Sequence, residues 1–525
     1  MSETLIQALR DPACYDHDVT GVEVHETHIS WILLTGDYAY KIKKPLEFGS
    51  FLDFSTLEQR RRLCEQEVRL NRRLAPSLYL AAVPISGTPE APRVDDASAP
   101  FEYAVKMRQF SNRHLFSTLQ EEGSLSLELI DDLIDQLVDF HESAARIAPD
   151  DPLGGAEATA EILAREFTLI APRLPGEARL ARLERLQALV EETQARLAPV
   201  LTERHAQGFV RETHGDIHLG NAVRHRGRAL LFDGIEFNDA LRWSDVGCDL
   251  AFLLMDLEAR DERALAHHAL NRYLELSGDY GLVRALGYYK LYRALVRVKV
   301  AALRLEQVGG DEREAVLAEI DHYLGLAEGY AEFRFPYLVL GAGVSGSGKS
   351  RFTGEMVRRL GAVRLRSDVE RKRLYGFAPL ADSRGSDVAL YAPEATRRTY
   401  QRLARLTGTL LEAGLPVCID ATCLARWQRD LLSHEAEARG LPQLIVSFEA
   451  DEATLRRRIE KRTRRGGDPS EAGLAVLERQ LATREPFAEE ERCHLVHLDT
   501  TAADASETLV SLIRQHMGHA VGEVD

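Results

Sequence analysis

The stretch GAGVSGSGKS, residues 341–350, constrains the fold of this chain more than any other feature. Its last eight residues match the pattern GxxxxGK[ST], which requires a strand before the loop and a helix after it. The sequence supplies both, because residues 337–342 are apolar and residues 351–360 have a helical pattern. Further apolar segments at 416–420 and 443–450 alternate with helical stretches, an order typical of a parallel sheet with helices on both faces.

A glycine-rich loop in this context is expected to bind phosphate. Glycines let consecutive backbone N–H groups converge on phosphate oxygens, and the positive end of the helix dipole adds to the attraction. Lys349 is expected to reach the terminal phosphates, and Ser350 to offer its hydroxyl to Mg²⁺. The sequence therefore predicts an α/β P-loop NTPase domain over residues 336–525, with ATP and Mg²⁺ as cofactors. The predicted binding residues are Gly343, Ser345, Gly346, Ser347, Gly348, Lys349 and Ser350.

The stretch RLRSDVERKRLYG, residues 364–376, follows one helix later. It resembles the corresponding segment of small P-loop kinases, namely polynucleotide kinases, zeta toxins, chloramphenicol phosphotransferase and gluconate kinase. The resemblance implies that Asp368 accepts the proton of an acceptor hydroxyl and that Arg371 holds the acceptor or the moving phosphoryl group, so that Lys349, Asp368 and Arg371 are catalytic. Asp368 also fits the cap of a helix over 369–375, which is the alternative interpretation.

Two further features belong to this predicted site. In VCIDAT, Asp420 ends an apolar strand, where it could bind Mg²⁺ through water or simply cap the strand. The run LRRRIEKRTRRGGDPS is typical of a solvated helix face, and we expect that role for residues 456–458. The kinase resemblance implies instead a lid over the phosphates, with Arg462 and Arg465 neutralising their charge.

A second kinase-like pattern lies in the first half of the chain, in RETHGDIHLGN. His214, Asp216 and Asn221 have the spacing H-x-D-x-x-x-x-N of a kinase catalytic loop, in which the aspartate acts as base or orients the acceptor and the asparagine binds the metal. His214 is expected to be structural. Asp233, in a predicted strand over 229–237, is expected to supply the second metal-binding carboxylate.

The order of the elements around this loop supports a bilobal domain. Residues 22–43 read as short strands with a turn at 35–37, and residues 101–110 as a buried strand. A helix capped by Ser55 or Thr56 lies between them and ends before Pro76. Residues 126–207 and 245–330 are predicted to be helical. The sequence therefore predicts an α+β, protein-kinase-like domain over residues 1–335, with Pro336 at the boundary.

The wording HGDxHxxN with a downstream FDxxEF resembles the aminoglycoside phosphotransferase and choline kinase superfamily. The resemblance implies that Lys41 grips nucleotide phosphates and that Glu67 positions it, although Lys43 and Glu65 are equally placed by spacing. It also implies an adenine-binding hinge at about residues 107–109 and makes Asp245 a structural anchor for the catalytic loop.

One departure from that superfamily weakens the comparison. The segment VHETHIS between the first two predicted strands contains no glycine, so this lobe is expected to hold phosphates less closely. Overall the chain resembles bacterial proteins that fuse an aminoglycoside phosphotransferase-like domain to a P-loop domain. A bifunctional kinase is the resulting prediction. The alternatives are a 5′-hydroxyl polynucleotide kinase in the P-loop half, or an ATP-binding regulator with a pseudokinase half.

The charge and hydropathy of the chain limit the classes of partner that we expect it to bind. The net charge of −16 is divided unevenly, about −17 for residues 1–330 and +1 for residues 331–525, so neither half has the basic surplus of a general nucleic-acid binder. At most a short 5′ end fits; a small-molecule hydroxyl on a sugar, amino-cyclitol, nucleoside or nucleotide-sugar fits better. No apolar stretch suits a membrane helix or a signal peptide, which predicts a cytoplasmic protein without a membrane partner. No oligomeric state is predicted.

Overall fold

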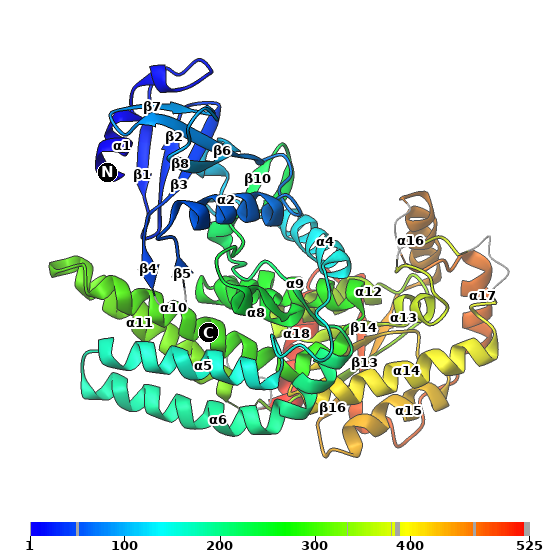
Figure 1. Cartoon of the computed structure of the whole chain (residues 1–525). Helices are drawn as coiled ribbons and strands as arrows, with labels where there is room; N and C mark the ends of the chain where they lie inside the picture. Colours follow the sequence, from blue (N-terminus) through cyan, green and yellow to red (C-terminus); the bar gives the residue numbers. More distant parts are fainter. Residues whose placement is uncertain are drawn as a thin grey trace. The chain divides into compact units, whose positions relative to one another are not determined.

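The computed structural model describes residues 2–48, 52–332, 334–379, 381–383, 389–465 and 469–518. The chain forms two compact units (Figure 1), of which the first comprises Met1–Asp256 and Tyr292–Leu324 and the second Leu257–Leu291 and Gly325–Asp525. The second unit therefore includes a segment that precedes residue 336 in the sequence. No helix among the described residues is long and apolar enough to cross a bilayer.

The first unit begins with an antiparallel sheet in the order β1-β2-β3-β8-β6-β7. Its strands are β1 (Glu23–Glu26), β2 (Ser30–Leu34), β3 (Tyr38–Lys43), β6 (Tyr79–Thr88), β7 (Ala91–Val94) and β8 (Glu102–Arg108). Helix α2 (Leu57–Asn71) packs on this sheet, because Cys64 and Val68 lie in the same buried cluster as Tyr79 and Val105. Thr56, rather than Ser55, caps the helix and accepts a hydrogen bond from the Gln59 amide.

The remainder of the first unit is mostly helical. Its helices include α4 (Leu127–Ser143), α5 (Ala156–Ile170), α6 (Glu177–Ala206) and α8 (Val246–Ala259), together with most of α10 (Val283–Leu305) and α11 (Gly310–Ala331). The predicted helical run over 126–207 is thus three helices. A hairpin of β10 (Ala222–His225) and β11 (Arg228–Leu231) lies between the predicted metal ligands Asn221 and Asp233. The predicted strand over 229–237 is too long: β11 ends at Leu231, and Asp233 has a left-handed φ of +63°.

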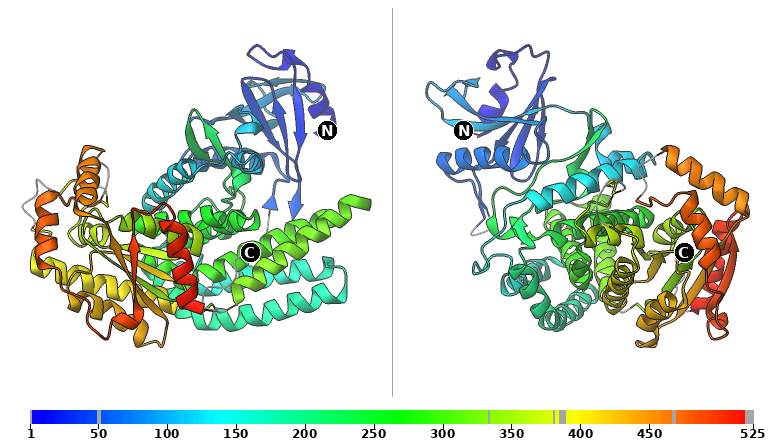
Figure 2. Two further views of the ribbon diagram at one scale, coloured as in Figure 1. Left: turned by 180° about the vertical axis from the view of Figure 1, so that it is seen from behind. Right: turned by 90° about the vertical axis from the view of Figure 1, so that its right-hand side faces the viewer.

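The second unit contains a five-stranded parallel sheet in the order β14-β15-β13-β16-β17. Its strands are β13 (Leu338–Ala342), β14 (Val363–Arg366), β15 (Val417–Asp420), β16 (Gln443–Glu449) and β17 (Leu495–Asp499). Helices α12 (Lys349–Leu360) and α18 (Ala505–Met517) cover one face, and α14 (Pro393–Glu412) and α15 (Arg426–Glu437) cover the other (Figure 2). This confirms the predicted P-loop fold. Ligands of such sheets bind beyond the carboxyl ends of the strands, which here include Ala342, Arg366 and Asp420.

Candidate active sites

The phosphate loop, residues 343–350, joins the end of β13 to the start of α12. Gly346 and Gly348 have φ of +83° and +99°, a left-handed region that residues with a Cβ rarely adopt. A Cβ at Gly346 would also lie 2.8 Å from the carbonyl oxygen of Leu455. Glycine has no Cβ, so the backbone can turn sharply at this position. The turn directs successive N–H groups into one concave space, which is how such loops bind phosphate.

Lys349 is the first residue of α12 and is only 8% exposed. Its Nζ donates hydrogen bonds to the carbonyl oxygens of Gly343 and Val344 at 2.8 and 2.9 Å. Burial lowers the pKa of the Lys349 ammonium, while the carboxylates of Asp420 and Asp368 act to raise it. The structure therefore brings the predicted lysine and both predicted carboxylates into one electrostatic neighbourhood at the carboxyl edge of the sheet.

Asp420 is the last residue of β15 and is 7% exposed. Its Oδ2 has no hydrogen-bond partner in the described part of the chain, and it lies 3.4 Å from Nε of Arg366. A buried carboxylate oxygen with unused acceptor capacity is the type of ligand that Mg²⁺ prefers. Ser350, the other predicted ligand, is exposed in the first turn of α12. These two side chains could hold Mg²⁺ together with nucleotide phosphates, where the ion would neutralise phosphate charge.

Asp368 lies in the first turn of α13 (Ser367–Leu374), whose N-cap residue is Arg366. The alternative interpretation of Asp368 as the helix cap is therefore wrong. One turn later, Arg371 is 7% exposed and its guanidinium carbon lies 4.7 Å from the ring centre of Tyr391. Burial and the charge of Asp368 raise the pKa of Tyr391 to about 12. Arg371 and Tyr391 are thus in contact, and the charge of Asp368 acts on Tyr391.

Helix α16 (Glu452–Arg465) carries the predicted lid arginines. Arg462 donates a hydrogen bond to the carbonyl oxygen of Ala472 at 2.5 Å, and its charge acts to lower the pKa of Lys349, which places it near the phosphate loop. Arg465 is the last residue of the helix, and its side chain lies outside the described part of the chain. Its predicted role in the lid is therefore not described by the structure.

Two residues that sequence reasoning did not select contact the phosphate loop. Arg458, expected to lie on a solvated helix face, instead donates to the carbonyl oxygens of Gly346 and Ser347, each at 3.3 Å. Gln480, in α17 (Leu474–Thr483), accepts a hydrogen bond from the amide of Ser345 at 2.7 Å. The signal for Arg458 was available, because it lies one helical turn from Arg462 on the same face of α16. Nothing in the local sequence marks Gln480.

The first unit holds a cluster of buried lysines and carboxylates beneath β3 and α2. Lys41 Nζ lies 2.9 Å from Glu67 Oε1 and 2.5 Å from Asp233 Oδ1. Lys43 Nζ lies 2.5 Å from the other oxygen of Glu67 and also pairs with Glu236. The Lys43 side chain is 1% exposed and that of Lys41 is 11% exposed, so Lys41 is the one nearer the surface of the site.

The other member of the predicted glutamate pair lies elsewhere. Glu65 forms an ion pair with Arg61 at 3.0 Å on the exposed face of α2, while Glu67 is fully buried and contacts both lysines. Only Glu67 therefore lies where a glutamate could position a phosphate-binding lysine.

The predicted catalytic loop is closely hydrogen-bonded. Asn221 Nδ2 donates to Asp216 Oδ2 at 2.9 Å, and His218 Nε2 lies 3.5 Å from the same oxygen. Burial acts to raise the pKa of Asp216, but the charge and hydrogen bond of His218 outweigh it and the pKa falls to about 2. The amide of Phe232 donates to the carbonyl oxygen of Asn221 at 3.0 Å, which brings the loop alongside the chain just before Asp233. His218 is a contributor that the spacing argument omitted.

A buried aspartate in α8 holds this loop in place. The two carboxylate oxygens of Asp249 each accept a backbone hydrogen bond at 2.8 Å, from the amides of His214 and Gly215. His214 in turn contacts the carbonyl oxygen of Phe232 through Nε2 at 3.0 Å, which fits its predicted structural role. The prediction that Asp245 anchors the loop is wrong, because that carboxylate pairs with Arg204 of α6 at 2.6 Å.

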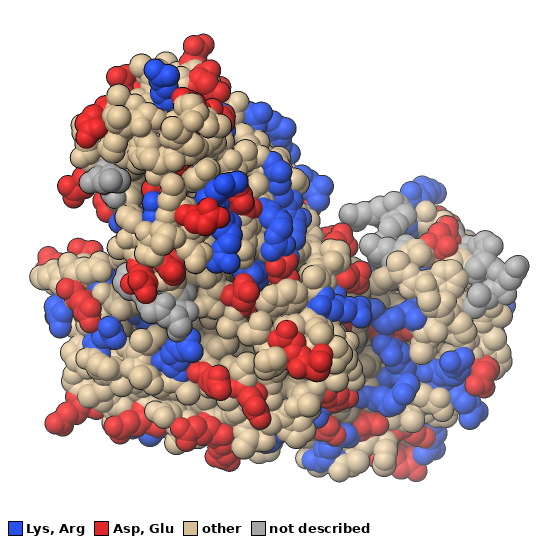
Figure 3. All heavy atoms as spheres, in the orientation of Figure 1, with Lys and Arg blue, Asp and Glu red and all other residues tan. Residues whose placement is uncertain are grey.

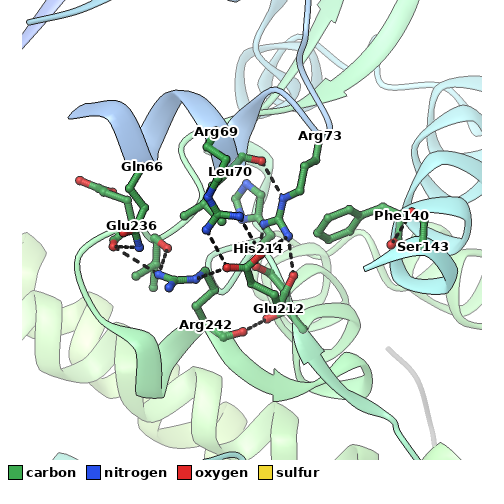
Figure 4. Close-up of polar contacts among 12 residues, drawn as sticks. Gln66, Arg69, Leu70, Arg73, Phe140, Ser143, Glu212, His214, Glu236 and Arg242 are labelled. Atoms are coloured by element: carbon green, nitrogen blue, oxygen red, sulfur yellow. Dashed lines mark hydrogen bonds and ion pairs between the residues drawn. The ribbon is translucent and has the colours of Figure 1, made fainter. Parts of the chain in front are cut away.

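Helix α2 is tied to the catalytic segment by arginines around one glutamate (Figure 4). Glu212, two residues before His214, accepts hydrogen bonds from Arg69 of α2 at 2.8 Å, from Arg73 just after the end of α2 at 3.1 Å, and from Arg242 at 3.3 Å. Basic side chains also gather over the exposed side of α2 (Figure 3). Because α2 carries Glu67, these contacts fix the lysine-binding glutamate relative to the catalytic loop.

We expect Glu212→Gln to loosen this connection. Glu212 is 7% exposed, and a neutral amide cannot compensate the charge of three arginines. The free energy of local opening of α2 should therefore fall by about 2 kcal/mol. Hydrogen exchange of the α2 amides should then be about 30-fold faster. Glu65→Gln on the same helix removes only an exposed ion pair and should change exchange by less than about twofold. Equal effects of the two substitutions would contradict a role for Glu212.

Two features bear on nucleotide binding by the first unit. The amide of Thr27 donates to the carbonyl oxygen of Ser30 at 2.9 Å, so β1 and β2 are joined by a tight turn without glycine. In the predicted hinge, the Gln109 amide already donates to the carbonyl oxygen of Asp37 at 3.1 Å.

Over the residues that the structure describes, no three His, Cys, Asp or Glu side chains form a metal site by themselves.

Comparisons with known proteins agree with this architecture. Residues 51–286 match the model of the phosphotransferase enzyme family, and residues 338–487 match an AAA domain. An uncharacterized protein of Mycobacterium tuberculosis is 29% identical over 416 residues, which are 78% of this chain and 81% of that protein.

Among solved structures, a sugar kinase from a Janibacter species is 22% identical. It covers 35% of this chain and 97% of its own, with a TM-score of 0.28. A choline/ethanolamine kinase family protein from Mesorhizobium loti is 11% identical and covers 62% of this chain and 98% of its own, with a TM-score of 0.36. The chain is thus similar to the phosphotransferase enzyme family over residues 51–286 and to an AAA domain over residues 338–487, which supports a fusion of a kinase-like domain with a P-loop domain.

Proposed function

We propose that the protein is an ATP-dependent kinase with two sites, each transferring the γ-phosphoryl group to a hydroxyl of a small molecule. The observation that carries the proposal is the grouping of buried Lys349 with Asp368 and Asp420 beside a phosphate loop. A nucleotide switch needs the lysine and a metal ligand. A kinase also needs a carboxylate beside the acceptor hydroxyl, and Asp368 is suited to that role.

In the P-loop site, the chain's own residues supply positioning and charge neutralisation. The oxygen of the acceptor hydroxyl bonds to the γ-phosphorus while Asp368 takes the proton of that hydroxyl. At the same time the bond between the γ-phosphorus and the β–γ bridging oxygen breaks. Lys349 and Arg462 offset the negative charge on the phosphates, and ADP leaves with the bridging oxygen. Ser350 and Asp420 would hold Mg²⁺. The phosphorylated alcohol is the second product.

In the first unit, Asp216 would orient the acceptor hydroxyl and take its proton. Its pKa of about 2 keeps it ionised at neutral pH, so it is always able to accept a hydrogen bond. Asn221 and Asp233 would hold Mg²⁺, and Lys41 would bind phosphate. Lys41 is paired with Asp233 in this structure, so phosphate binding requires that contact to be shared or exchanged.

The P-loop unit also offers a place for the acceptor. A pocket of about 510 Å³ lies between the N-terminal ends of α14 and α15. Tyr391 and Trp427, which are 49% and 43% exposed, are two of the six exposed large hydrophobic side chains among the described residues, and both line it. Tyr391 also contacts Arg371. The lining residues are Tyr391, Pro393, Glu394, Thr396, Arg397, Trp427 and Gln428. We propose that an acceptor with a flat ring face, either a sugar or a base, binds here.

The proposal predicts that Trp427→Ala weakens acceptor binding. Loss of one stacking face costs about 1–2 kcal/mol, so KM for the acceptor should rise about tenfold while KM for ATP is unchanged. Phe335→Ala, which removes another exposed aromatic ring of the same unit, is the matched control and should change neither value.

The direct test of the function is ADP release with a panel of sugars, amino-cyclitols, nucleosides, nucleotide-sugars and 5′-hydroxyl oligonucleotides. We expect turnover with a small alcohol that is lost in variants of the two sites. Nucleotide binding without transfer to any acceptor would favour a regulatory ATP-binding protein. Labelled phosphate on the oligonucleotide alone would identify the P-loop unit as a polynucleotide kinase.

A further inference from the structure

Residues 257–291 pack in the P-loop unit, although most of them lie within the stretch that matches the phosphotransferase family. Helix α9 (Arg263–Ser277) lies against β14, which is an edge strand of the parallel sheet. The 5% exposed Asn271 accepts a hydrogen bond from the backbone amide of Arg364 at 2.7 Å. Helix α9 therefore covers an edge strand whose amide would otherwise need water or another partner.

One carboxylate of α9 bonds two arginines of that strand. Glu275 accepts from Arg364 at 3.1 Å with Oε2 and from Arg366 at 3.2 Å with Oε1. Residues two apart on a strand point to the same face, which is why a single side chain can reach both. The Glu275 and Arg366 side chains are 14% and 12% exposed, so this pairing is shielded from solvent.

Arg366 is also bound on its other side. Its Nε lies 3.4 Å from Oδ2 of Asp420, the residue opposite it in the pairing of β14 with β15. Two carboxylates, Glu275 and Asp420, therefore share one guanidinium. The contact with Asp420 is an ion pair without the geometry of a hydrogen bond, which leaves Oδ2 of Asp420 without a hydrogen-bond partner among the described residues.

The same segment holds the helix that carries Asp368. Arg373 of α13 donates to the carbonyl oxygen of Glu275 at 2.5 Å, at the C-terminal end of α9 where carbonyl groups lack helical partners. Glu370 of α13 is fully buried and accepts from Tyr280 at 3.3 Å. These two side-chain contacts join residues 257–291 to α13.

We propose that Glu275 is a positioning residue of the P-loop site, supplied by a helix outside the P-loop domain's own sequence. It draws Arg366 away from Asp420 and so keeps that carboxylate available for Mg²⁺. Without Glu275, the guanidinium would pair fully with Asp420 and neutralise it. The proposal rests on the proposed function, because it takes Asp420 as a metal ligand.

The test uses the full chain with Asp216→Asn and Asp233→Asn, which disable the first site. Glu275→Gln keeps the shape of the side chain but removes its charge. We expect the Mg²⁺ concentration for half-maximal binding of a fluorescent ATP analogue to rise about 10-fold to 100-fold, the usual cost of disturbing residues behind a metal ligand. Adding Arg366→Gln to Glu275→Gln should restore the parent value, because the competing cation is then gone. The Mg²⁺ concentration for half-maximal binding by Glu275→Asp should lie between those of the parent chain and Glu275→Gln.

The controls separate this proposal from the proposed function. Glu355→Gln breaks another carboxylate–arginine pair of the same unit, with Arg358, and should leave the Mg²⁺ dependence unchanged. If Asp420→Asn and Lys349→Met weaken nucleotide binding but Glu275→Gln does not shift the Mg²⁺ dependence, the role of Glu275 is wrong while the site stands. A shift that Arg366→Gln fails to reverse would reduce Glu275 to a folding residue. If Asp420→Asn and Lys349→Met have no effect, the proposed function itself fails.

Discussion

Lys349→Met should lower phosphoryl transfer by the P-loop unit about 100-fold to 1,000-fold, the cost of removing one aligned charge from a water-poor site. The ammonium is almost fully buried beside Asp368 and Asp420, so no solvent-exposed cation can take its place. Methionine keeps the unbranched stem, which preserves most of the packing at the start of α12. Turnover at saturating ATP and acceptor, measured in an Asp216→Asn chain, isolates this unit.

The control for this prediction is Lys461→Met, because Lys461 is an exposed lysine of the same unit. It should leave turnover within about twofold, as expected for a surface substitution. Lys349 also donates to two loop carbonyl groups, so the melting temperature of each variant must be measured. Full turnover in a folded Lys349→Met chain would place the transferred phosphoryl group away from the phosphate loop and remove the basis of the proposal.

The parts of this site that could be predicted from sequence are those encoded by short segments. The phosphate loop, Asp368 and Asp420 each lie at or just beyond the end of a strand, and in a parallel sheet the carboxyl ends of strands lie at one edge. The position of each residue at the end of a strand, together with the resemblance to small P-loop kinases for Asp368, therefore predicted one site. The same reasoning placed Asp216 and Asn221 five residues apart in one loop, where the structure joins them by a hydrogen bond.

The residues that sequence reasoning missed depend on packing between distant segments. Gln480 reaches the amide of Ser345 across 135 positions of sequence, and no local pattern marks such a contact. Asp245 and Asp249 both lie near the start of one helix, and only the direction of each side chain decides which meets the catalytic loop. Helix α9 was predicted as a helix, but its association with β14 rests on Glu275 and Asn271, whose partners lie about 90 residues further along the chain.

Asp216→Asn should have the corresponding effect on the first unit, a loss of about 100-fold to 10,000-fold in turnover of that unit's acceptor. Asparagine is nearly isosteric and can still accept the hydrogen bond from Asn221, so the fold of the loop should be retained. What it cannot do is take a proton. The measurement is single-site turnover in a Lys349→Met chain, with ATP and each acceptor that the unmodified protein uses.

The matched variant is Asp368→Asn in an otherwise unmodified chain, because it changes the same group in the other unit. If the two units act on different acceptors, each substitution should abolish turnover of one acceptor and spare the other. The turn that joins β1 to β2 contains no glycine, so the KM of the first unit for ATP should be the higher of the two. If Asp216→Asn changes no turnover with any acceptor while Asp368→Asn abolishes all of it, the first unit does not catalyse transfer. Its buried pairs of Lys41 and Lys43 with Glu67 would then hold together a domain that binds without reacting.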